Sequence, residues 1–149
     1  MSLRDWLNNR WLTEHETSRQ EIADLLGVID RDLDDCRTPR LSSDWKLTIG
    51  YNAAVQVATA ALAVAGYRAS REAHHYRVIQ SLAYTIGLDS NVVAQLDAFR
   101  KKRNISDYER AGAVSDSEVL EMISLAKKLR GELVEWLVKN HPEFLPEQP

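Results

Sequence analysis

The residues with the clearest potential for chemistry follow a basic run near position 100. Four consecutive basic residues, Arg100 to Arg103, precede Asn104, Asp107 and Tyr108. A guanidinium, an amide, a carboxylate and a phenol therefore lie within a short stretch, and such a set could hold a phosphate or order a loop. The helix that contains the run is predicted to end between residues 103 and 106. Stabilisation of cations by the dipole at a helix C-terminus, or simple solvation, is the simpler explanation for the two lysines of the run.

A second candidate is a row of polar residues in an otherwise apolar segment: Thr48, Asn52, Gln56 and Thr59. Their spacing of four, four and three residues places them on one face of a helix. They either satisfy one another and nearby backbone groups in the core, or they line a groove or a subunit interface.

The third candidate is the pair His74-His75. His75 shares a helical face with Ile79, Leu82 and Ile86, so it is predicted to be a partly buried, hydrogen-bonded structural residue. A role in a site is the alternative, because histidine titrates near neutral pH.

Helices must position all of these residues. A short helix is expected over residues 3–11, and apolar residues then recur at helical spacing over about 20–36, 43–65, 70–86, 90–105 and 116–140. No segment alternates with the period of a strand. The sequence therefore predicts an all-α fold, an up-and-down antiparallel bundle of about five helices. Four aspartates near the end of the 20–36 helix are expected to be solvated: Asp30, Asp32, Asp34 and Asp35.

Length and composition indicate one domain over residues 1–142, with its core in about 20–140 and a loose tail at 143–149. The 149 residues carry a net charge of −3, so any contact with nucleic acid must come from a local basic patch. Residues 47–67 contain no charged side chain, but their central Asn52 and Gln56 favour a helix buried in the bundle over a membrane span. A cytoplasmic location is expected.

Several classes of site have no signature in the sequence. It contains no P-loop, no Rossmann glycine pattern, no CxxC pair and no HExxH. With the single cysteine, Cys36, no internal disulfide is possible. No metal and no cofactor are therefore expected.

Three motifs follow one another along the chain: an alanine-rich helix, a histidine helix and a distinctive helix end. They read Tyr51-Asn52-Ala53-Ala54 with Ala60-Ala61-Leu62-Ala63 and Gly66-Tyr67, His75 with Val78-Ile79, and Leu96-Asp97-Ala98-Phe99-Arg100 with Arg103-Asn104-Ile105-Ser106-Asp107-Tyr108. Together they resemble the HEPN family, the higher-eukaryote and prokaryote nucleotide-binding domains. The resemblance covers roughly residues 20–140. It implies a helical bundle that is usually a homodimer.

The resemblance also implies a function. Many HEPN proteins are RNA-cleaving toxins paired with a minimal nucleotidyltransferase antitoxin. In these toxins, an Arg and a His with four to six residues between them form a metal-independent site across two subunits. Arg103 fits the Arg, and Tyr108 stands at the first position for the His, as in a subgroup that ends in Arg-x-x-x-Asp-Tyr. The candidate catalytic residues are thus Arg103 and Tyr108, and the candidates for RNA or phosphate binding or for support of the motif are Arg100, Asn104, Asp107, His75 and Asn52.

Tyr108 changes the chemistry that this motif predicts. Cleavage through the RNA 2′-hydroxyl needs proton transfer, and tyrosine, with a reference pKa of about 10, is a poor base. A ribonuclease would therefore need His74 or His75 to reach Arg103 from another helix or subunit. The alternatives are a non-catalytic dimeric interaction or scaffold module, and a protein in which the partner nucleotidyltransferase modifies Tyr108.

Overall fold

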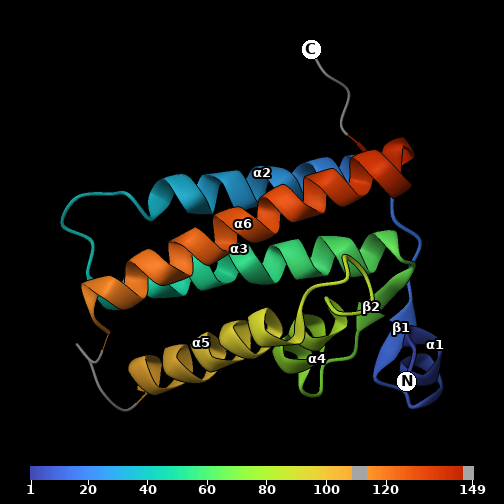
Figure 1. Cartoon of the computed structure of the whole chain (residues 1–149), viewed down its shortest axis with the longest axis horizontal. Helices are drawn as coiled ribbons and strands as arrows, with labels where there is room; N and C mark the ends of the chain where they lie inside the picture. Colours follow the sequence, from blue (N-terminus) through green and yellow to red (C-terminus); the bar gives the residue numbers. More distant parts are fainter. Residues whose placement is uncertain (109–113, 146–149) are drawn as a thin grey trace.

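The fold is an all-α bundle with one very small β-sheet (Figure 1). The structure is a computed structural model that describes residues 1–108 and 114–145, with side chains for all of these except 105–108. Within this part of the chain there are six α-helices: α1 (Leu3–Asn8), α2 (Arg19–Asp35), α3 (Ser43–Val64), α4 (His74–Ser81), α5 (Ser90–Tyr108) and α6 (Asp116–Asn140). The predicted all-α class is confirmed, and long helices that follow one another in the chain run in opposite directions. α3 and α6, which pack together, run in the same direction.

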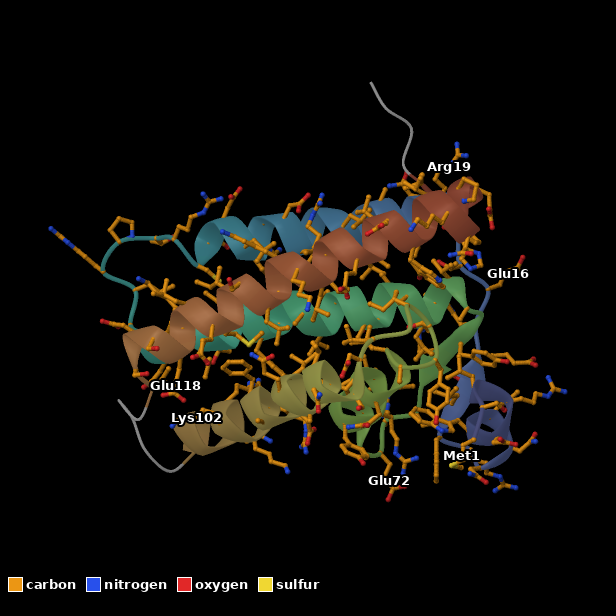
Figure 2. All side chains as sticks on the ribbon, viewed as in Figure 1. Met1, Glu16, Arg19, Glu72, Lys102 and Glu118 are labelled. Atoms are coloured by element: carbon orange, nitrogen blue, oxygen red, sulfur yellow. The ribbon has the colours of Figure 1, made fainter. Side chains whose placement is uncertain are left out.

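Helix α3 is the central element. Helices α2 and α6 pack along it, and α4 and α5 lie against its other side (Figures 1 and 2). By length and composition α3 could cross a membrane, yet 72% of its most apolar window is buried inside the protein. That is the behaviour of a bundle's core helix, as the sequence predicts.

Serine caps begin three of the long helices. The hydroxyls of Ser18, Ser42 and Ser115 accept hydrogen bonds from backbone N–H groups in the first turns of α2, α3 and α6. Each cap satisfies one of the amide groups that have no partner inside the helix. The Thr17 hydroxyl, next to the cap of α2, donates to Glu21 Oε1 at 2.6 Å.

The two-stranded sheet was not predicted. β1 (Leu12–Glu14) pairs antiparallel with β2 (Tyr67–Ala69), so that Thr13 lies opposite Arg68. Strands of three residues are too short to show alternation in the sequence. The N-terminal helix consequently ends at Asn8, earlier than expected, and Arg10 turns the chain into β1 with a φ of 65°.

Two further helix boundaries differ from the prediction. α4 is much shorter than the expected span from 70 to 86, because Ala73 adopts the left-handed conformation before His74 and turns replace the helix after Ser81. α5, in contrast, continues past residue 106 to Tyr108. The basic run from Arg100 therefore lies inside α5 and not in its last turn, so the dipole explanation for its lysines is wrong.

At the C-terminal end, a 3₁₀ turn (Pro142–Phe144) follows α6. Phe144 and Leu145 pack against the core, and the Arg19 side chain donates to the Glu143 carbonyl at 3.2 Å. The expected loose tail at 143–149 is thus packed at its start, and residues 146–149 lie outside the described part.

Candidate functional site

Four helices converge on a polar pocket of about 180 Å³. α2, α3, α4 and α5 each contribute to its lining, which consists of Asp32, Thr48, Ile49, Tyr51, Asn52, His75 and Arg103. Three of the residues that the sequence singles out, Asn52, His75 and Arg103, come from three different helices and meet here. We call this the Arg103 pocket.

Tyr51 contacts both His75 and Arg103 in the Arg103 pocket. Its side chain is almost fully buried, at 1% exposure, and its hydroxyl lies 3.2 Å from Nδ1 of His75. The guanidinium carbon of Arg103 lies 5.6 Å from the centroid of the Tyr51 ring, within the range of a cation–π interaction. The buried phenol therefore holds an imidazole at its edge and a guanidinium over its face.

Burial and nearby charges set the ionisation of these groups. Burial lowers the pKa of His75, and the charges of Arg103, His74 and Arg100 lower it further. Burial also raises the pKa of Tyr51 to about 12, against the opposing effect of Arg103. At neutral pH the pocket thus contains a neutral imidazole, a protonated phenol and a guanidinium cation.

Asp32 and Asn52 form the wall of the pocket next to α2. The Asn52 amide donates to Asp32 Oδ2 at 2.7 Å, and Arg31 Nη2 donates to Asp32 Oδ1 at 3.0 Å. Asp32 is only 5% exposed, so the prediction of a solvated side chain is wrong at this position. It lies one helical turn after the buried Ile29, on the side of α2 that faces α3.

In the polar row of α3, some side chains bond to backbone groups of their own helix and some line a pocket. Thr48 and Thr59 donate to the carbonyls of Asp44 and Val55, one turn earlier in the same helix, at 3.0 and 2.9 Å. Asn52 instead bonds to α2, and both Thr48 and Asn52 line the Arg103 pocket.

Two of the remaining predicted residues, Arg100 and Asn104, are not part of the pocket lining. Arg100 Nε donates to Asp97 at 2.7 Å, which raises the pKa of Arg100, and its guanidinium lies 5.5 Å from the Tyr76 ring centroid. Asn104 is exposed. The side chains of Asp107 and Tyr108 fall outside the described ones.

The two lysines of the basic run form ion pairs. Lys101 Nζ lies 3.6 Å from Asp97, and Lys102 Nζ lies 3.5 Å from Glu118 at the start of α6 (Figure 2). Arg103 is thus the one member of the run that lines the pocket.

Two polar residues of the pocket lining were missed by the sequence-based site prediction, Asp32 and Tyr51. Tyr51 did carry a signal, since it is the one aromatic residue among the small side chains of positions 50–64. A large polar-tipped ring in such a run must point where there is space for it. Asp32 carried no such signal, because it stands among three similar aspartates.

Within the described residues, no group of three or more His, Cys, Asp or Glu side chains is arranged to hold a metal ion. Comparison with protein-family models, with curated proteins and with solved structures gave no significant match. The HEPN resemblance therefore stays a prediction from the sequence motifs.

Proposed function

We propose that this chain is a HEPN-type RNA-binding protein that cleaves RNA without a metal in the Arg103 pocket. One observation carries the proposal: Arg103 and His75, from different helices, line the same pocket on either side of Tyr51. His75 supplies the proton acceptor that Tyr108 could not.

In the proposed reaction Arg103 binds and neutralises a backbone phosphate of the RNA. Neutral His75 accepts the proton of the neighbouring 2′-hydroxyl at Nε2, while the 2′-oxygen attacks phosphorus. The P–O5′ bond then breaks, leaving a 2′,3′-cyclic phosphate and a 5′-hydroxyl that takes up a proton from solvent. For Nε2 to be free, Nδ1 must carry the ring proton and donate it to the Tyr51 oxygen, and their 3.2 Å separation allows this hydrogen bond.

The test is incubation of purified full-length protein with a fluorescent single-stranded RNA in EDTA. We expect cleavage by the wild type. Both His75→Ala, which removes the general base, and Arg103→Ala, which removes the charge that neutralises the phosphate, should lose at least about 100-fold. Lys101→Ala is the matched control, because this neighbouring cation is 68% exposed and outside the pocket. A substrate with 2′-deoxyribose throughout should bind without being cut.

Two outcomes would contradict RNA cleavage in the Arg103 pocket. If the wild type binds RNA through Arg103 but cuts nothing, the protein is a non-catalytic binder. If neither Arg103→Ala nor His75→Ala differs from Lys101→Ala, the pocket is not the site.

A non-catalytic interaction module is the second candidate, and exposed apolar residues favour it. Trp45 is 61% and Leu120 is 68% exposed, in the first two turns of α3 and α6. The beginnings of these helices lie together, since Ser43 donates to Asp116 at 2.8 Å. A homodimer through this surface, or a nucleotidyltransferase partner bound to it, would cover both side chains. Light scattering on the wild type and on Trp45→Ser with Leu120→Ser would show whether a dimer forms and whether these residues hold it.

A further inference from the structure

We propose that a second, apolar pocket on the same side of α3 binds a nucleobase of the RNA whose phosphate lies in the Arg103 pocket. This inference rests on the proposed function and specifies its substrate. The second pocket measures about 90 Å³ and lies between α2, α3, α4 and β2. Its lining consists of Glu21, Leu25, Thr59, Leu62, Ala63, Tyr67, Arg68, Ala69, His74 and Val78. We call it the Tyr67 pocket.

The two pockets share their walls. α2, α3 and α4 line both, and the consecutive residues His74 and His75 line one pocket each. On α3, Asn52 and Thr59 belong to the same polar row and are two helical turns apart, a rise of about 10 Å. This row is on the side of α3 away from α6, because Gly50, which packs against Met122 of α6, lies roughly half a turn around the helix from Asn52. A strand laid along the row would meet both pockets in succession.

The lining of the Tyr67 pocket suits a base and not a phosphate. Leu25, Leu62 and Val78 are aliphatic, and Tyr67 and His74 offer rings against which a base can stack. A volume of 90 Å³ leaves room for a single ring rather than for a purine.

Glu21 supplies the recognition of the base edge. Its Oε1 accepts hydrogen bonds from the Thr17 hydroxyl at 2.6 Å and from His15 at 2.7 Å, and these contacts lower the pKa of the carboxyl. Oε2 faces Arg68 Nη2 at the longer distance of 3.7 Å, which leaves that oxygen able to accept from a ligand. A carboxylate accepts from the exocyclic amine of cytosine, whereas uracil has a carbonyl oxygen, itself an acceptor, at that position and its one donor on this edge at N3. The base we assign to this pocket is therefore cytosine.

The experiment measures binding by full-length protein of two fluorescent 2′-O-methyl oligonucleotides, one of cytidines and one of uridines, which cannot be cleaved through the 2′-position. Inorganic phosphate is titrated separately by NMR. Thr59→Ile places one extra methylene in the Tyr67 pocket while keeping a β-branched side chain. It should weaken oligocytidine binding about tenfold, the usual worth of one stacked base, without changing the affinity for phosphate. Glu21→Gln should remove the preference for cytidine over uridine.

Glu72→Gln is the control, since this exposed residue just before α4 lines neither pocket, and thermal melts show whether each variant is folded. The inference is overturned if Thr59→Ile, folded, binds oligocytidine as the wild type does, or if the wild type binds both oligonucleotides equally. If the wild type prefers oligocytidine to oligouridine but does not bind inorganic phosphate, the result would contradict the phosphate site at Arg103 and support the base pocket.

Discussion

The hydroxyl of Tyr51 lies 3.2 Å from Nδ1 of His75, and this contact ties the central helix α3 to the first turn of α4. Replacing Tyr51 by Phe keeps the ring under Arg103 but removes the hydrogen bond. We expect the free energy of unfolding in urea to fall by about 1 kcal/mol. RNA cleavage should fall as well, because His75 loses its orientation. Tyr84→Phe, at an exposed ring, is the control; equal effects of the two changes would contradict the role given to the Tyr51 hydroxyl.

The titration of His75 reports its environment. Its pKa should lie below the ordinary 6.5 in an NMR titration, and it should rise in Arg103→Ala, because one of the charges that lower it is removed. The unfolded chain then binds a proton at a pH where the folded chain does not. Stability should therefore decrease as the pH falls below 6.5 towards the folded pKa, and His75→Gln should remove this part of the decrease. A midpoint at or above 6.5 would contradict the buried position.

The Asn52–Asp32 hydrogen bond is expected to matter for stability as well as for the site. Asn52→Ala removes an amide donor from a carboxylate that is 5% exposed, and we expect a loss of about 1–3 kcal/mol in denaturant unfolding. Gln56→Ala, one turn further along the same face, is the matched control and should have a much smaller effect. A similar loss in both variants would mean that the effect comes from the helix face and not from the pair.

Glycines in three helices should respond in opposite directions to substitution. A Cβ at Gly27 or at Gly131 would meet nothing within 4 Å, so an alanine there should stabilise the protein by roughly 0.5–1 kcal/mol through helix propensity. At Gly50 the added Cβ would lie 3.3 Å from Met122 Cγ and 3.6 Å from Cys36 Sγ. Gly50→Val should therefore cost about 1–3 kcal/mol by overpacking. Thermal melts of the three variants would show whether the sign changes at Gly50.

The features that depend on long helical patterns were predictable. The apolar spacing in α2, α3 and α6 repeats over many turns, and Ser42 and Ser115 are strong caps, so these elements follow from local sequence alone. The left-handed Ala73 did not follow, because alanine is not typical of that conformation. The three-residue strands did not follow either, because each pairs with a segment distant in the sequence. Local propensity contains no information about such partners.

The residues of the candidate site also divide into some that the sequence predicted and some that it did not. Arg103, Asn52 and His75 were singled out by residue type and spacing, and all three line one pocket. Their partners Tyr51 and Asp32 were not, since the importance of a buried phenol or carboxylate depends on what another helix places beside it. Of the four basic residues, α5 presents Arg103 to the pocket, and this direction depends on how α5 packs against α3, which residue type alone does not contain.

The pairing of β1 with β2 has a consequence for the order of folding. Thr13 and Arg68 are 55 residues apart in the chain, so their strands can meet only after a long loop has closed. The surface that receives the N-terminal segment, including Arg77 of α4 stacked 3.6 Å over the Trp11 ring, exists only once α3 and α4 are in place. The first fourteen residues should therefore dock last and detach first. In native-state hydrogen exchange, the amides of β1 should lose protection in a separate opening of lower free energy than the opening that exposes α3.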